Sequence, residues 1–169
     1  MPEKETIERA HEDAREGKSP STQAGEFVRE EIHHIREGKH GASSTKQAIA
    51  IGLSTARRAG VKLKVPKKGT TSEGTRRAAA RDSRKAKSGG KKKKTSARRS
   101  RAMLRRLKRE GRSAASPKAL AKQARSAARR RSAASRSASA KKAAKTKGPA
   151  KRRAAAKKGA RTRARRGSH

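Results

Sequence analysis

The sequence predicts a mainly α-helical protein: a small three-helix N-terminal domain followed by a long, largely disordered Lys/Arg/Ala-rich tail with transient helices. Charge is the first observation behind this prediction. Residues 1–64 contain 12 Lys and Arg against 10 Asp and Glu, whereas residues 65–169 contain 40 against 3. Large apolar residues divide the opposite way, since 11 of the 16 Leu, Ile, Val, Met and Phe residues lie in residues 1–64. We therefore expect that only residues 1–64 bury enough apolar surface to offset the entropy cost of ordering the chain.

Three helices are predicted within residues 1–64 from apolar stripes and from signals at the helix ends. The first, over residues 3–16, is mostly charged. The second, over residues 20–37, begins after a Ser-Pro pair and carries apolar side chains at helical spacing. The third begins at Ser44, which has the spacing of a capping box with Gln47. The glycines predicted to end these helices are Gly17, Gly38 and Gly60.

A domain of about 64 residues is marginally stable when it is alone. We therefore expect that residues 1–64 could pair two chains as a homodimer. Gly52 lies inside the third predicted helix and is interpreted as a position of close packing.

The remaining chain is predicted to form three segments. Residues 65–96 have the Pro, Gly, Ser and Thr content of a linker and are interpreted as a basic linker. Residues 97–131 could form a pair of short helices, although few apolar side chains are present to hold them. Residues 132–169 are built almost wholly from Ala, Ser, Lys, Arg and Gly, and are interpreted as a low-complexity basic tail. Because like charges repel, we expect this tail to stay open when free.

Several classes of function are disfavoured by the composition. The absence of Cys removes thiolate metal sites and thiol nucleophiles, and no apolar run approaches the roughly 18 residues of a membrane span. His33, His34 and His40 lie near Glu30 and Glu31, but adjacent histidines on a helix point in different directions. We predict no metal site, no cofactor and no enzyme activity. The start MPEKETIERA lacks an apolar secretory segment, so a cytoplasmic protein is expected.

The net charge of +39 predicts a polyanionic partner, and DNA is the partner that we expect. A flexible tail cannot fix side chains against base edges, and this tail has no aromatic residue on which bases could stack. We therefore expect sequence-tolerant binding of double-stranded DNA through its phosphates, with histone-like compaction or bridging of the nucleoid. The predicted phosphate ligands are Lys91, Lys92, Lys93, Lys94, Arg98, Arg99, Arg105, Arg106, Arg129, Arg130, Arg131, Arg152 and Arg153.

Two alternatives fit the same charge pattern. The basic tail could bind RNA or associate with a ribosome, since phosphate electrostatics distinguish poorly between nucleic acids. Alternatively, the N-terminal helices could hold a protein partner while the tail anchors that partner to nucleic acid.

Two segments resemble known families. AKKAAKTKGPAKRRAAAKKGA, residues 140–160, is similar to the tails of linker histones and of bacterial histone H1-like proteins. REGKHGASSTKQAIAIGLSTARRAGVKL, residues 36–63, resembles a bacterial family of small basic proteins classed as a domain of unknown function, over about residues 17–65. That second resemblance implies a bacterial source and a nucleoid-associated location, but it implies no activity and no site residues.

Overall fold

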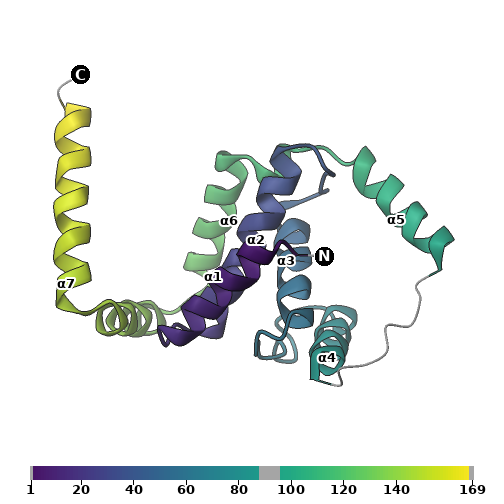
Figure 1. Ribbon diagram of the computed structural model, residues 1–169, viewed down its shortest axis with the longest axis horizontal. Coiled ribbons are helices and arrows are strands. Elements are labelled where there is room, and N and C mark those ends of the chain that lie inside the picture. The colour runs from purple at the N-terminus through teal and green to yellow at the C-terminus, as the bar shows by residue number, and fades with distance from the viewer. Residues whose placement is uncertain (1, 88–95, 168–169) are drawn as a thin grey trace. The chain divides into compact units, whose positions relative to one another are not determined.

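The computed structural model describes residues 2–87 and 96–167, and the secondary structure in these ranges is helical (Figure 1). The chain divides into two compact units, residues 1–124 and residues 125–169. The helices are α1 (Lys4–Arg15), α2 (Pro20–Arg36), α3 (Thr45–Arg58), α4 (Glu73–Lys87), α5 (Ala97–Arg109), the 3-10 helix η1 (Ser113–Ala115), α6 (Pro117–Arg129) and α7 (Ala133–Gly167).

The prediction of a three-helix domain with a largely disordered tail is wrong. Helix α4 lies within the predicted linker of residues 65–96, and α7 occupies most of the predicted low-complexity tail of residues 132–169. Intrinsic propensity explains the difference, because Ala is the best helix former and Lys and Arg are close behind it. In these segments that preference prevails over the repulsion between like charges.

In the basic half of the chain, residues 65–169, serine N-caps set where α4, α6 and α7 begin. The hydroxyl of Ser72 accepts a hydrogen bond from the backbone N–H of Thr75 at 3.2 Å, before α4. Ser116 caps α6 in the same way through the N–H of Ala119 at 3.2 Å. Ser132 caps α7 through the N–H of Ser135 at 3.1 Å. Each hydroxyl satisfies a backbone donor that a helix N-terminus leaves without an intrahelical partner.

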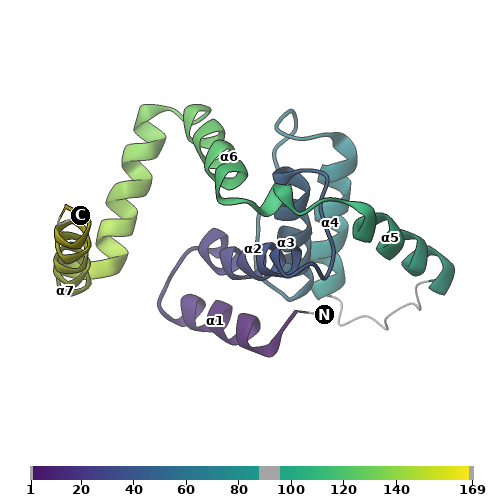
Figure 2. The same ribbon diagram turned by 90° about the horizontal axis from the view of Figure 1, so that it is seen from above.

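The three helices predicted in residues 1–64 are confirmed, and they pack together around α2 (Figure 2). The glycines that follow them, Gly17, Gly38 and Gly60, have φ of 70°, 81° and 99°. One core cluster joins α1, α2 and α3 through Ala10, Ala24, Phe27 and Ala56, with Ile7 and Leu53 at its edge. A second cluster combines Ile32 and Ile35 of α2 with Ala48 of α3. The apolar stripes of α1, α2 and α3 therefore face one another.

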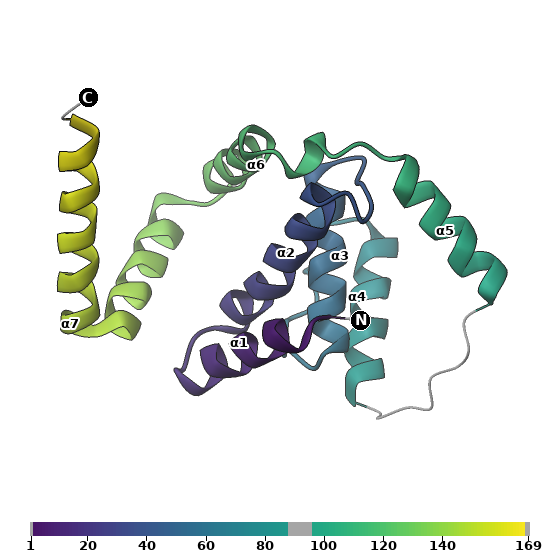
Figure 3. The ribbon, with the colours of Figure 1, turned by 45° about the horizontal axis from the view of Figure 1, so that its top comes forward.

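Residues of η1 and α6, from the basic half of the sequence, complete this core. Ala114 and Ala115 of η1 are buried in the second cluster, and Leu120 of α6 packs against it. Two hydrogen bonds hold the η1 backbone: Thr45 Oγ1 donates to the Ala114 carbonyl at 2.7 Å, and Arg36 Nε donates to the Ala115 carbonyl at 2.9 Å. Residues 97–131 do form two helices, and the segment that connects them is anchored on α2 and α3 (Figure 3).

Helix α4 also belongs to the core unit, because it packs against α3. Ala79 is buried in α4, and Ser54 of α3 donates a hydrogen bond to Asp82 Oδ2 at 2.6 Å. Within the described residues, no helix is long and apolar enough to cross a membrane.

Gly41 lets the end of α5 approach the turn between α2 and α3. The N–H of Gly41 donates to the Leu107 carbonyl at 2.9 Å, and the N–H of Ala42 donates to the Gly111 carbonyl at 3.2 Å. A Cβ atom on Gly41 would lie 1.9 Å from the carbonyl oxygen of Glu110. Any side chain at this position would therefore push the two backbones apart.

The substitution Gly41→Ala is expected to release residues 107–111 from the turn while the α1–α2–α3 core stays folded. Hydrogen exchange should show fast exchange of the amides at positions 41 and 42, with protection retained in α2 and α3. Gly111→Ala is the matched control, because its nearest neighbour beyond the adjacent residues, Ser113 Oγ, would lie 3.9 Å from the new Cβ. Equal protection of the two amides in both variants would contradict this account of Gly41.

Candidate nucleic-acid interface

Helix α5 carries seven Lys and Arg residues among its 13 and no acidic residue. Arg98, Arg101, Arg105 and Arg109 follow one another at intervals of three or four residues, so they lie along one face of the helix. The opposite face carries Met103 and Leu104, whose exposed fractions are 57% and 47%. The helix therefore separates an arginine face from a short apolar face.

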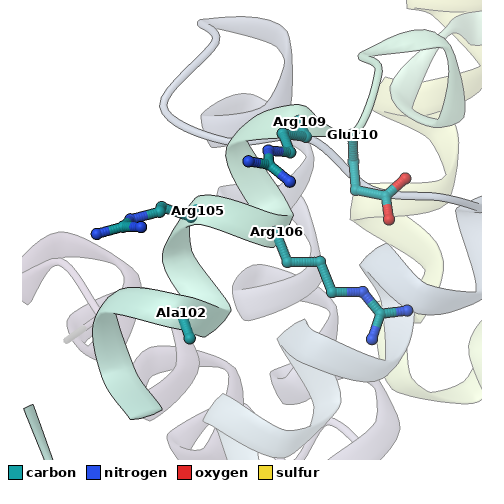
Figure 4. A pocket seen from close by; sticks show the side chains of 5 residues that line it. All are labelled: Ala102, Arg105, Arg106, Arg109 and Glu110. Atoms are coloured by element: carbon teal, nitrogen blue, oxygen red, sulfur yellow. The ribbon is translucent and has the colours of Figure 1, made fainter. Parts of the chain in front are cut away.

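The arginine face is open to solvent. Figure 4 shows the side chains of Arg105, Arg106 and Arg109 extending away from α5 around the small side chain of Ala102. These residues and Glu110 line a shallow surface hollow, and a second one lies among Arg98, Arg101, Ala102 and Arg105. A guanidinium group presents its donors in a planar fork, which fits the oxygens of a phosphate.

Helix α6 carries a second line of cations. Lys118, Lys122, Arg125 and Arg129 are spaced at four, three and four residues, and all four side chains are exposed. This spacing again places the charges along one side of the helix. Leu120, which packs against the core, lies off that line.

Helix α7 distributes its charge differently. It contains 14 Lys and Arg residues among 35 and no acidic residue, without an apolar stripe. Gly148, with φ of 67°, interrupts the helical backbone, and Pro149 follows it. Near the start of the helix, the guanidinium of Arg131 donates hydrogen bonds to the Ser135 carbonyl at 3.0 Å and to the Ser139 hydroxyl. Cations on all sides of such a helix suit contact with a surface of distributed negative charge.

The charge of this region cannot be neutralised within the chain. Residues 97–167 contain 28 Lys and Arg residues and a single carboxylate, Glu110. Each of these cations whose side chain the structure describes is exposed. Several acidic residues nearer the N-terminus already have partners there, such as Glu26 with Arg9 at 2.9 Å and Asp13 with Lys18 at 2.5 Å. Hydrogen bonds to Asp13 and Glu16 raise the pKa of Lys18. Hydrogen bonds from Arg76 likewise lower the pKa of Glu73.

The structure brings together only part of the predicted site. Arg98 and Arg105 share the arginine face of α5, whereas Arg99 and Arg106 are offset from them by about 100° because each follows its neighbour directly. Lys91, Lys92, Lys93 and Lys94 lie outside the described residues. The other predicted ligands lie at the end of α6 (Arg129), in the turn before α7 (Arg130 and Arg131) and in α7 beyond Gly148 (Arg152 and Arg153).

Arg101 and Arg109 complete the arginine face, and the prediction missed them because it favoured adjacent pairs of cations. Helical periodicity was the signal that could have found them, since both lie three or four residues from a predicted ligand. The sequence places His34 and His40 near Glu31, and no metal site is predicted there; the structure places one potential metal-ligand atom of each of these three residues within 4.8 Å of the others. The sequence signal for this cluster is a Glu-x-x-His pair in α2, followed by a further histidine in the turn after the helix.

The described part of the chain is thus a helical, strongly basic protein in which a compact core carries cationic helices. A model of DUF6496, a family of unknown function, matches residues 17–69. This match confirms the predicted resemblance to a family of unknown function, and it spans α2, α3 and the segment after them, just under a third of the 169-residue chain. No curated protein and no solved structure matches the chain.

Proposed function

We propose that the protein binds double-stranded DNA through its phosphates, with little preference for sequence. The observation that supports this proposal is the 28-to-1 excess of cations over carboxylates in residues 97–167, carried on exposed helical surfaces. Such a surface attracts a polyanion and gains free energy from the counterions released when phosphates bind. Arg supplies 22 of the 40 cations of residues 65–169, and Arg suits bidentate contact with phosphate.

Helical geometry favours duplex DNA over other nucleic acids in this proposal. Phe27 is the sole Phe, Tyr or Trp residue of the sequence and is only 2% exposed, so no exposed side chain of these three types is available on which unpaired bases could stack. The major groove of DNA admits an α-helix, whereas the major groove of an RNA duplex is deep and narrow. A helix with the arginine face of α5 therefore fits the edges of a DNA groove better than those of an RNA groove.

Compaction requires that one assembly contact two DNA segments. A single chain could do this, because residues 1–124 carry α5 while residues 125–169 carry α7. A homodimer through residues 1–64 would have the same effect. A nucleoid-associated location in a bacterial cytoplasm is part of this proposal.

Affinity for duplex DNA is expected to fall steeply with salt. If about ten phosphates are engaged, the log–log slope should be near −9, and affinity should fall by about 10⁵ between 50 and 200 mM salt. Fluorescence anisotropy with the full chain on two DNA duplexes of unrelated sequence measures both the slope and the tolerance of sequence. A structured RNA of matched length is the control. If RNA bound more than tenfold tighter, or if one DNA sequence did, the proposal would be replaced by RNA association or by specific DNA recognition.

A further inference from the structure

A cluster of two histidines and a buried glutamate lies at the C-terminal end of α2 and in the turn that follows. Glu31 and His34 are three residues apart on α2, so they are neighbours on the helix surface. His40 follows Gly38, whose φ of 81° allows the chain to turn back toward the helix. One potential ligand atom from each of the three residues lies within 4.8 Å of the others.

One oxygen of the Glu31 carboxylate lacks a hydrogen-bond partner in the protein interior. Its side chain is only 10% exposed, and its Oε1 atom is buried without a hydrogen bond. Leaving a buried carboxylate oxygen unpaired is costly, so such an atom in a folded protein calls for an explanation such as a bound ion. The oxygen therefore faces a position where a positive charge would be stabilised.

The tautomer of His40 directs a nitrogen lone pair toward Glu31. Its Nδ1 lies 3.2 Å from the carbonyl oxygen of Gly41, and a carbonyl oxygen can only accept, so Nδ1 carries the hydrogen. In the neutral ring the lone pair is then on Nε2, and Nε2 lies 3.5 Å from Glu31 Oε1. Two acceptors thus face each other across a gap, an arrangement that a cation between them would stabilise.

The distance between His40 Nε2 and Glu31 Oε1 fits two ligands of a tetrahedrally coordinated metal ion. Zinc bonds to histidine nitrogen and carboxylate oxygen are each about 2.1 Å, so two such ligands at a tetrahedral angle lie about 3.4 Å apart. The separation of 3.5 Å between His40 Nε2 and Glu31 Oε1 agrees with this value. We propose that Glu31, His34 and His40 bind a divalent transition-metal ion of the zinc class. Two imidazoles and one carboxylate are a known ligand set for such ions, with water in the fourth position.

Further carboxylates surround this site. His34 Nε2 lies 3.2 Å from Glu3 Oε1 and 3.9 Å from Glu30 Oε1. Carboxylates around a ligating histidine fix its ring orientation and raise its basicity. Glu3 precedes α1, so the same contacts connect the start of α1 to the end of α2.

Metal binding here would stabilise the turn that anchors α5. His40 directly precedes Gly41, whose N–H holds the carbonyl of Leu107. A metal that fixes His40 against α2 therefore fixes the attachment point of residues 107–111 as well. The proposed role of the ion is structural, and it is independent of whether the partner of the basic helices is DNA.

The test uses the full chain after treatment with a chelator, with zinc chloride as the probe. Calorimetric titration should give saturable binding with one zinc ion per chain, and the melting temperature should rise as zinc is added. Glu31→Gln and His40→Ala should each lower the affinity by roughly 100-fold or more. His33→Ala is the matched control: His33 neighbours His34 in sequence but is exposed and lies outside the cluster, so this variant should bind as the wild type does.

Three outcomes would overturn the proposal. The wild-type chain could show no saturable zinc binding, which would leave Glu31 and His40 as an ordinary ion pair. Zinc binding could persist in His40→Ala, which would place the ion elsewhere. X-ray absorption at the zinc edge provides a measurement on the wild type alone, in case a variant does not fold. A coordination shell with fewer than two imidazoles would exclude this site.

Discussion

A chain with Arg98, Arg101, Arg105 and Arg109 replaced by glutamine is expected to bind duplex DNA on the order of 10² to 10³ times more weakly at 0.15 M salt. Each phosphate contact contributes about 0.9 to the log–log salt slope, which amounts to roughly a fivefold gain in affinity at that salt relative to 1 M. Four lost contacts therefore account for the effect. The slope itself should decrease by about 3.6. Gln is a good helix former, so α5 should keep its conformation.

The control for this prediction must remove the same charge from another surface. Arg15, Lys46, Arg58 and Lys62 are exposed cations of residues 1–64, and their replacement by glutamine also lowers the net charge by four. Anisotropy titrations on one duplex compare the two variants, and circular dichroism confirms that both remain helical. If the control loses as much affinity as the α5 variant, binding depends on net charge alone and α5 is not an interface. If neither variant loses affinity, α6 or α7 carries the binding.

The sequence predicted the part of the fold that rests on local signals. Apolar spacing located α1, α2 and α3, and the cap at Ser44 is present, where its hydroxyl accepts from the N–H of Gln47 at 3.2 Å. These features depend on residues within one or two helical turns, so a single sequence contains them.

The prediction of disorder failed because it weighed net charge above helix propensity. In the basic half, the Ala-rich composition and the N-caps Ser72, Ser116 and Ser132 are local signals that together predict helices. The prediction gave more weight to the long runs of Lys and Arg than to those caps. Locating the caps at Ser72 and Ser132 first would have predicted α4 and α7 as well.

Long-range contacts could not be predicted from the sequence. Ala114 and Ala115 are small residues in an Ala-rich stretch, and nothing local marks them as core rather than tail. The role of Gly41 depends on the backbone of residues 107–111, which is about 70 positions away. The cluster of Glu31, His34 and His40 likewise depends on where the turn directs His40. Tertiary packing decides all three.

The same substitution is expected to have opposite effects at two glycines of the helical core. Gly52 lies within α3, as a predicted position of close packing, and a Cβ on it would lie 2.7 Å from the Cα of Val28 and 3.0 Å from the Phe27 carbonyl oxygen. Gly25 lies within α2, and a Cβ there would meet nothing within 4 Å. Helix propensity alone favours Ala at both positions by about 0.5–1 kcal/mol.

Packing reverses the sign at Gly52. The neighbours that a Cβ would strike include the backbone of α2, which cannot rotate away as the end of a side chain can, so α2 and α3 must separate. Overpacking of this kind costs about 1–3 kcal/mol, which exceeds the gain in propensity. Gly52→Ala should therefore lower the free energy of unfolding of residues 1–124, and Gly52→Val should lower it further. Gly25→Ala should raise it by a few tenths to 1 kcal/mol. Urea denaturation of the full chain, followed by circular dichroism, measures all three variants. Stabilisation by Gly52→Ala would show that α2 and α3 do not approach as closely as described, and would remove the packing account of this core.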